Sequence, residues 1–171
     1  MPIYLQLQDV DYPYTYTDHT RKIARAFLLD ENNNIAIHFL HRNDIFGDQC
    51  YYETPGGGVD EGETYEEGLK REIEEETGYH CEILSFLGEV KDYYNLIHRE
   101  NINRFYLAKA TEFVGKHFAS SGDLIIEKTE FIPPEELLRL YKEQSDNGVA
   151  GIVKRRELPM LEEALKVLKT I

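Results

Sequence analysis

Short apolar runs separated by turn residues predict a series of strands along this chain. Residues 22–30 form a nearly continuous apolar run that is typical of a buried strand, and the Glu-Asn-Asn-Asn sequence that follows favours a turn. Apolar side chains then alternate over residues 35–40, which predicts a hairpin with the preceding strand. The rest of the pattern predicts a loop at 44–49, a short strand led by Tyr51 and Tyr52, strands at 82–90, 102–110 and 124–132, and a loop at 111–122.

Residues 65–77 carry the periodicity of a helix. Tyr65, Leu69 and Ile73 recur every four residues and form an apolar stripe that would face a core. A threonine followed three residues later by a glutamate forms a capping box at the start of this helix, and Gly78 supplies the left-handed residue that ends it.

Two more helices are predicted at the end of the chain. Pro133 and Pro134 open the first, and residues 157–169 carry the amphipathic pattern of the second. Strands before and after a central helix, followed by two helices, favour an α/β fold with a mixed sheet covered by helices on both faces. The 171 residues suit one domain, in which residues 1–20 form an N-terminal extension and residues 152–171 hold the C-terminal helix.

The N-terminal extension carries Tyr12, Tyr14 and Tyr16 at alternate positions. In an extended segment this spacing places three rings on one side. Such rings can stack on a nucleobase, or they can pack on the domain surface or on a second subunit of a homodimer. The sequence leaves these alternatives open.

Composition and charge exclude several classes of protein. The formal net charge of −13 argues against broad electrostatic binding of nucleic acid or anionic membranes, which requires clustered Lys and Arg. Cys50 and Cys81 have neither metal-binding spacing nor the pattern of a disulfide framework. With no signal-peptide pattern and no long apolar run, a cytoplasmic protein is predicted, without secretion or membrane insertion.

Three glutamates give the predicted helix an acidic edge. Glu72, Glu75 and Glu76 are spaced three and four residues apart, which stacks their side chains on one side of the helix. An acidic run of this kind is most often a solvated face, and like charges one turn apart destabilise a helix by about 0.2–0.5 kcal/mol a pair. A hard divalent cation such as Mg²⁺ would remove that repulsion, because it prefers oxygen ligands.

The residues around this helix favour the cation. Before it, Pro55 and three successive glycines form a turn whose backbone can approach an ion or a phosphate without side-chain obstruction. Glu63 and Arg71 bracket the acidic loop and the helix, and an ion pair between them would hold the two together.

These residues resemble the Nudix box of the Nudix (MutT-like) hydrolases. The matching positions are Gly57, Glu63, Arg71-Glu72-Ile73, Glu75-Glu76, Gly78 and a final apolar position filled by Tyr79. The departures are Gly68, where alanine is common in the family, and Tyr79, which replaces an aliphatic residue. The resemblance implies an α/β/α sandwich and the Mg²⁺- or Mn²⁺-dependent hydrolysis of a nucleoside diphosphate linked to another moiety.

The same resemblance implies roles for individual residues. Glu72, Glu75 and Glu76 would bind the metal, with the Gly57 carbonyl as a further ligand. A carboxylate of this cluster, Glu75 or Glu76, would serve as general base, whereas in several family members the base comes from a later region, which makes Glu127 a further catalytic candidate. The sequence does not choose between them.

Substrate contacts are less well defined. Arg42, Arg99 and Arg104 are candidate phosphate contacts, although such residues more often form surface ion pairs. Tyr93 and Tyr94 follow a predicted strand in a predicted loop, at a position where some family members that act on dinucleotide polyphosphates have an aromatic residue. Candidate substrates are ADP-ribose, dinucleotide polyphosphates, nucleoside triphosphates and nucleotide sugars. A non-catalytic nucleotide-sensing domain is the alternative, and a structural Ca²⁺ site is a third interpretation.

Overall fold

The computed structural model of this protein describes residues 1–117 and 125–171. Within these residues the strands form an eight-stranded sheet in the order β1-β6-β7-β2-β3-β4, in which β5 pairs with β2 and β8 pairs with β3. The strands are β1 (Ile3–Gln6), β2 (His19–Leu29), β3 (Ile35–Asp44), β4 (Gly47–Glu53), β5 (Gly56–Gly58), β6 (Tyr79–Tyr94), β7 (Arg99–Phe113) and β8 (Ile126–Ile132). The helices are α1 (Tyr65–Thr77), α2 (Pro134–Glu143) and α3 (Gly148–Leu168), with a short 3₁₀ helix at Asn95–Ile97.

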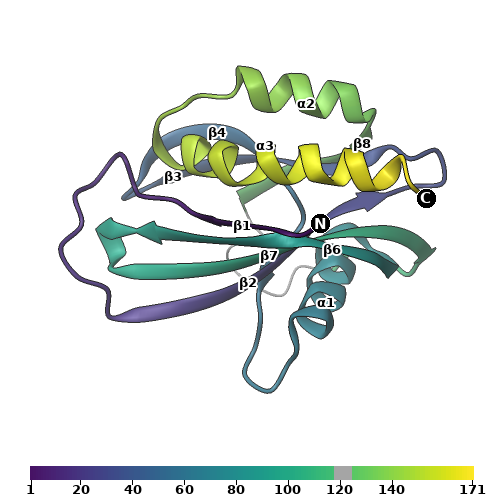
Figure 1. The fold of residues 1–171 in the computed structure, drawn as a ribbon, viewed down its shortest axis with the longest axis horizontal. Coiled ribbons are helices and arrows are strands. Elements are labelled where there is room, and N and C mark those ends of the chain that lie inside the picture. The colour runs from purple at the N-terminus through teal and green to yellow at the C-terminus, as the bar shows by residue number, and fades with distance from the viewer. Residues whose placement is uncertain (118–124) are drawn as a thin grey trace.

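The sheet is mixed and has helices on both faces. β1 runs parallel to β6 and β2 runs parallel to β7, while the other pairs are antiparallel. Figure 1 shows α2 and α3 along one face of the sheet and α1 on the other. The predicted α/β fold, with a mixed sheet between helical layers, is therefore confirmed.

The centre of the sheet is β2, which is apolar along most of its length because both of its faces are covered. Ala24, Ala26 and Leu28 pack in a cluster with α1, whereas Phe27 and Leu29 belong to a second cluster with α2 and α3. Small side chains on the α1 side allow that helix to lie close to the strand. Burial on both faces explains the continuous run that the sequence shows.

The helix α1 has the predicted bounds. The Thr64 hydroxyl accepts a hydrogen bond from the backbone N–H of Glu67, the Glu67 carboxylate accepts one from the backbone N–H of Thr64, and Gly78 ends the helix at φ 80°. Leu69 and Ile73 are fully buried, as the apolar stripe predicts. Tyr65 at the start of the stripe is only partly buried.

Two predicted loops are wrong, because the strands around them are longer than their apolar patterns. The loop at 44–49 is a tight hairpin in which Asp44 of β3 pairs with Gly47 of β4. Tyr93 and Tyr94 are the last residues of β6, where Tyr94 pairs with Arg99. Register shifts between β6 and β7 interrupt the alternation of side chains, and the alternation is what the sequence uses to locate strand ends.

The two ends of the chain also differ from the predicted organisation. The N-terminal extension contributes β1 to the sheet, a parallel pairing over a long separation that no local pattern reveals. The Tyr16 ring stacks on His98 at 4.0 Å, and the Tyr12 ring lies edge-on to Phe46, so these two rings pack on the protein itself, while Tyr14 is exposed. The last helix starts at Gly148, ahead of the expected residue 152. Residues 118–124, part of the predicted loop 111–122 and the start of the predicted strand 124–132, lie outside the described residues.

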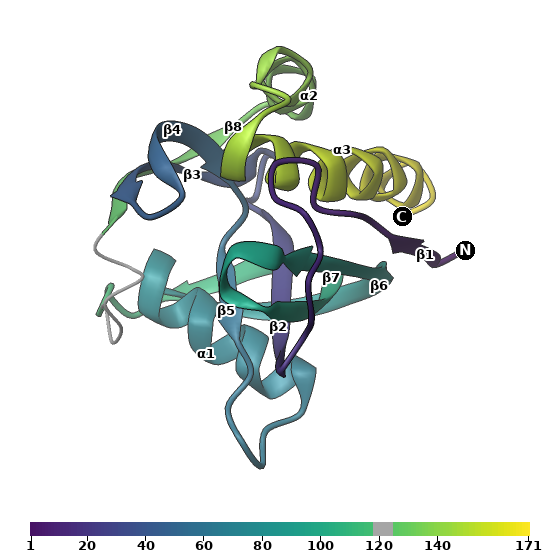
Figure 2. The ribbon, with the colours of Figure 1, turned by 90° about the vertical axis from the view of Figure 1, so that its left-hand side faces the viewer.

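The sheet opens where β2 and β3 diverge. These strands pair only at Leu29 and Ile35, and beyond that point β3 continues with β4 and β8 while β2 continues with β5 and β7. Figure 2 shows the two groups of strands in separate parts of the molecule, with α1 next to β5. Among the described residues, no helix has the length and apolar character of a membrane span.

Candidate active site

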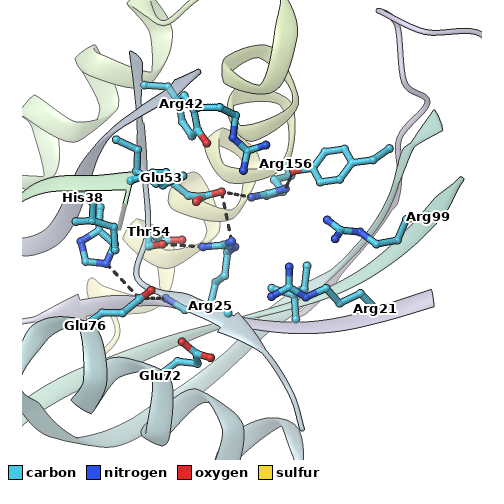
Figure 3. A pocket seen from close by; sticks show the side chains of 18 residues that line it. Arg21, Arg25, His38, Arg42, Glu53, Thr54, Glu72, Glu76, Arg99 and Arg156 are labelled. Atoms are coloured by element: carbon cyan, nitrogen blue, oxygen red, sulfur yellow. Dashed lines mark hydrogen bonds and ion pairs between the residues drawn. The ribbon is translucent and has the colours of Figure 1, made fainter. Parts of the chain in front are cut away.

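The carboxylates of α1 line a cavity at the opening between β2 and β3. Glu72 and Glu76 line this central cavity of about 130 Å³, and Glu75 lies with Glu72 on an adjoining hollow. Figure 3 shows Glu72 and Glu76 projecting from α1 at one edge of the central cavity. All three residues are buried, with exposed fractions of 8% for Glu72, 7% for Glu75 and 4% for Glu76. They therefore do not form the solvated face that an acidic run usually indicates.

The glycine strand β5 lies directly against α1. The backbone N–H of Gly56 donates a hydrogen bond to Oε1 of Glu76 at 2.9 Å. A Cβ atom at Gly57 would lie 2.7 Å from the carboxyl carbon of Glu72, and one at Gly56 would lie 2.2 Å from the Ala24 carbonyl oxygen. Only glycine permits this approach, so the turn before the helix brings backbone and carboxylates together, as its composition predicts.

Arg71 ties the acidic loop to the helix, and the expected ion pair with Glu63 is present. The Arg71 guanidinium donates to both oxygens of Glu63, at 2.8 and 2.9 Å, to the Gly58 carbonyl at 2.9 Å and to Glu72 at 3.0 Å. The hydrogen bonds from Arg71 hold the pKa of Glu63 below its usual value. Gly68 leaves room for this loop, since a Cβ there would lie 3.3 Å from the Glu63 carboxylate.

His38 of β3 reaches the same cluster from the other side of the cavity. Its Nε2 lies 3.2 Å from Oε1 of Glu76, and its Nδ1 lies 2.7 Å from the Thr129 hydroxyl. In the tautomer that carries its hydrogen on Nε2, the imidazole donates to the Glu76 carboxylate. The histidine is buried and satisfied by its neighbours, and it orients Glu76.

Five arginines line the central cavity together with the carboxylates: Arg21, Arg25, Arg42, Arg99 and Arg156. Figure 3 shows them reaching the cavity from several elements. The carboxylate of Glu53 pairs with Arg25 at 3.3 Å and with Arg156. Burial disfavours the charged form of Glu53, but Arg25 and Arg156 hold its pKa below the usual value.

A buried polar network anchors the end of β4 to α3. Arg156 is 1% exposed and also lies 3.3 Å from Asp92 of β6. The neighbouring Glu157 accepts a hydrogen bond from the Thr54 backbone N–H at 2.9 Å, and burial raises the pKa of its carboxyl group. The helix α3 thus fixes the segment that leads into the glycine strand.

The predicted substrate contacts separate into two groups. Arg42, Arg99 and Tyr94 line the central cavity. Tyr93 does not: it lies 3.4 Å from the Gln6 amide. Arg104 is also outside the cavity, where it pairs with Glu89 at 3.1 Å and stacks on the ring of Tyr65.

The catalytic candidate Glu127 also lies away from the cavity. It is on β8, its side chain is 52% exposed, and its Oε1 lies 3.6 Å from Nδ1 of His41. The structure thus does not bring Glu127 together with Glu72, Glu75 and Glu76.

Sequence reasoning missed Arg21, Arg25, Glu53 and Arg156. The two arginines of β2 are four residues apart with Ile23 midway between them, so the period of a strand places all three side chains on one face. The sequence therefore contained a signal that could have identified Arg21 and Arg25. Glu53 and Arg156 meet only because α3 packs on β4, and no local pattern reports such a contact.

The donor set at the carboxylates suits a hard divalent cation. Within the described parts of the chain, no three His, Cys, Asp or Glu side chains already surround a single point as metal ligands. Mg²⁺ does not need such a cage, because it usually binds through one or two carboxylates, several waters and the phosphates of a substrate. Buried carboxylates beside a glycine backbone supply the oxygen donors that this mode of binding needs.

These features define a class of α/β protein whose cavity combines carboxylates with arginines, a combination that suits a cation together with a phosphorylated ligand. The family follows from the comparison with known sequences. A sequence model of the NUDIX domain matches residues 19–150, and the chain belongs to this family.

Individual relatives cover part of the chain. An 8-oxo-dGTP diphosphatase from Haemophilus influenzae is 37% identical over 70 residues, which are 41% of this chain and 48% of that protein, so the match spans about half the length of the relative. A relative from Bacillus subtilis is 32% identical over 104 residues, which cover 58% of this chain and 67% of its own length.

Solved structures agree on the fold. A NUDIX hydrolase from Nitrosomonas europaea superposes with a TM-score of 0.58 at 12% identity, covering 71% of this chain and 78% of its own. The ORF135 protein of E. coli superposes with a TM-score of 0.57 at 20% identity, covering 88% of this chain and 91% of its own. At these identities the likeness concerns the fold alone.

Proposed function

We propose that this protein is a Nudix pyrophosphohydrolase that uses Mg²⁺ or Mn²⁺ to hydrolyse a phosphoric anhydride bond in a nucleoside diphosphate linked to another moiety. The observation that carries the proposal is the central cavity, in which Glu72 and Glu76 lie beside the glycine strand and across from arginines. Carboxylates attract the cation and arginines attract phosphate, so the cavity offers binding groups for both the metal and the substrate. The name of the Haemophilus influenzae relative, a diphosphatase, supports the same reaction class.

Glu72, Glu75 and Glu76 would hold the cation, with the Gly57 carbonyl as a further oxygen donor. When bound, such a cation acidifies a water molecule and neutralises charge on the leaving phosphate. Arg71 would hold Glu72 and the acidic loop in register through the bonds to Glu63 and the Gly58 carbonyl.

A carboxylate of the cluster would accept the proton of the attacking water. Glu76 is fixed by the Gly56 N–H and by His38, which suits a holding role. Glu75 has a looser contact, a 3.5 Å hydrogen bond from Arg71, and is our candidate for the base. The water oxygen would bond to one phosphorus, and the bond from that phosphorus to the bridging oxygen would break.

The cavity arginines would position the phosphates. Arg25 and Arg156 are held by Glu53, and Arg42 lies 3.4 Å from Asp44. These guanidinium groups are fixed before any ligand binds, which reduces the entropy lost on binding. In this way a chain of strongly negative net charge can attract a polyanion.

The test is a substrate screen with purified protein. ADP-ribose, dinucleotide polyphosphates, nucleoside triphosphates including 8-oxo-dGTP, and nucleotide sugars are incubated with Mg²⁺ or Mn²⁺, and products are separated by chromatography. We expect a nucleoside monophosphate as one product, no turnover after chelation of the metal, and loss of turnover in Glu75→Gln. The matched control is Glu162→Gln, a replacement of an exposed glutamate on α3. Tight nucleotide binding without any turnover would instead favour the non-catalytic nucleotide-sensing alternative.

A further inference from the structure

Two arginines of the central cavity have no acidic partner. Arg25 and Arg156 pair with Glu53, but for Arg21 and Arg99 the described residues contain no carboxylate within ion-pair distance. Within the part of the chain that the structure describes, the buried Nε of Arg99 has no hydrogen-bond acceptor either. In Figure 3 no dashed line reaches these two side chains.

The sheet brings the two guanidinium groups to the same side of the cavity. Arg21 is on β2 and Arg99 is on β7, which are parallel neighbours with His19 opposite Arg99 and Arg21 opposite Asn101. Side chains two residues apart point to the same face of a strand. Arg21 and Arg99 therefore lie diagonally across adjacent strands on the face that borders the cavity, as Figure 3 shows.

Both side chains are positioned without being neutralised. The Arg99 guanidinium lies 4.8 Å above the ring of Tyr94. The Arg21 guanidinium occupies space that Gly58 leaves open, since a Cβ at Gly58 would lie 3.0 Å from its Nε and Nη2. Such contacts fix where the charges lie but leave their hydrogen-bond donors available.

Burial and neighbouring positive charges disfavour the charged forms of Arg21 and Arg99. Burial lowers the pKa of Arg21 and the charge of Arg25 lowers it further, while Glu72 and Glu53 act more weakly in the opposite direction. Burial also lowers the pKa of Arg99, with Arg21 and Arg156 acting in the same direction. A bound anion would favour the charged forms of both side chains, because it places an opposite charge beside them.

We propose that Arg21 and Arg99 form a subsite for a terminal phosphate group, one with three non-bridging oxygens, which the substrate carries in addition to the pyrophosphate at the carboxylates. The proposal rests on the proposed function, because the pyrophosphate occupies the same cavity. A terminal phosphate has three free oxygens and a charge of about −1.5 to −2, which matches two guanidinium groups. A phosphate inside an anhydride bridge offers fewer oxygens and less charge.

This group can come from two sources, and matched ligand pairs distinguish them. dATP and dADP differ in the terminal phosphate of the polyphosphate chain. NADP⁺ and NAD⁺ differ in a phosphate on the ribose. All four contain an anhydride bond that the proposed reaction can cleave, so kcat/KM is measured for each with Mg²⁺ in excess.

The variants are Arg21→Gln and Arg99→Gln, with Arg139→Gln as the control because Arg139 is exposed on α2. We expect the wild-type protein to prefer the member with the additional terminal phosphate in at least one pair. Each cavity variant should reduce that preference about tenfold through KM, since a charge-assisted hydrogen bond contributes about 1.5–3 kcal/mol. The control variant Arg139→Gln should keep the preference of the wild-type protein. A preference for dATP assigns the group to the polyphosphate chain, and a preference for NADP⁺ assigns it to the ribose.

The proposal is overturned if neither pair shows a preference, or if the two variants lower kcat/KM equally for both members. Arg99→Lys keeps the charge and replaces Arg99→Gln if the glutamine variant does not fold. Absence of turnover with every compound would contradict the proposed function instead. In that case dissociation constants from calorimetry for the same pairs and variants decide on the subsite, with the same preference expected.

Discussion

Gly57 and Glu72 are so close that a Cβ atom on the glycine would lie 2.7 Å from the carboxyl carbon of the glutamate. The contact joins the glycine strand to α1 at the edge of the central cavity. Gly57 is outside the left-handed region of backbone conformation, so a side chain there meets a steric barrier and no backbone strain. The absence of a side chain thus sets where the Glu72 carboxylate lies.

Gly57→Ala should therefore displace Glu72 and lower kcat by more than about tenfold, because a shift of one ångström in a catalytic group can cost about a hundredfold. The thermal midpoint should change little, because the Cβ meets the end of the flexible Glu72 side chain, which can move aside. Steady-state kinetics and a melting curve are the measurements. Unaltered kcat would mean that the position of Glu72 does not matter for turnover.

Glu75→Gln separates catalysis from stability. The change removes one of three neighbouring negative charges on α1, and among the described residues the Glu75 carboxylate accepts one hydrogen bond, a long one from Arg71 at 3.5 Å. Stability should thus be equal to or slightly above that of the wild type, while kcat at saturating substrate should fall by about a hundredfold or more. Steady-state kinetics with Mg²⁺ test the expected fall in kcat, and urea unfolding tests the expected stability. Full activity of the variant would rule out Glu75 as base and as metal ligand.

The acidic helix was the easiest element to predict because all of its signals are local. The capping box, the apolar stripe and the terminal glycine lie within a few residues of one another, and they fix the bounds of α1 and the side on which Glu72 and Glu76 lie. Glu63 and Arg71 are near enough in sequence for their ion pair to be expected. In these cases local chemistry decides the structure.

The arginine side of the cavity was harder to predict because distant segments assemble it. Arg156 reaches Glu53 only through the packing of α3 on β4, and Arg99 lies beside Arg21 only because β7 is parallel to β2. The sequence suggests both Arg99 and Arg104 as phosphate contacts, yet Arg99 faces the cavity whereas Arg104 pairs with Glu89. A sequence shows that a residue is charged, but the sheet order determines what it meets.

Leu69→Ala tests the packing of α1 on the sheet. Leu69 is fully buried in the cluster formed with β2, so its truncation should cost about 2–5 kcal/mol of unfolding free energy. The control is Ile45→Ala, at a residue that is 68% exposed and should lose little. Urea unfolding followed by circular dichroism gives both values. Equal stability of the two variants would mean that α1 contributes no buried apolar contact at this position.

The pair of Arg25 and Arg156 around Glu53 predicts how stability depends on pH. Because the folded pKa of Glu53 is below its ordinary value of 4.5, the ionised carboxylate stabilises the folded state above about that pH. The contribution is lost as the pH falls through the folded pKa. Burial raises the pKa of Glu157, which acts in the opposite sense, so the effect of Glu53 has to be isolated by substitution.

Glu53→Gln should therefore be less stable than the wild type at about pH 7, and the difference in unfolding free energy should shrink as the pH falls towards about 3. Urea unfolding at a series of pH values measures this difference directly. Glu162→Gln, at an exposed position, should show no such trend. If the difference for Glu53→Gln stayed constant over the whole range, the charge of Glu53 would not be what holds Arg25 and Arg156, and the ordering of the cavity arginines would need another cause.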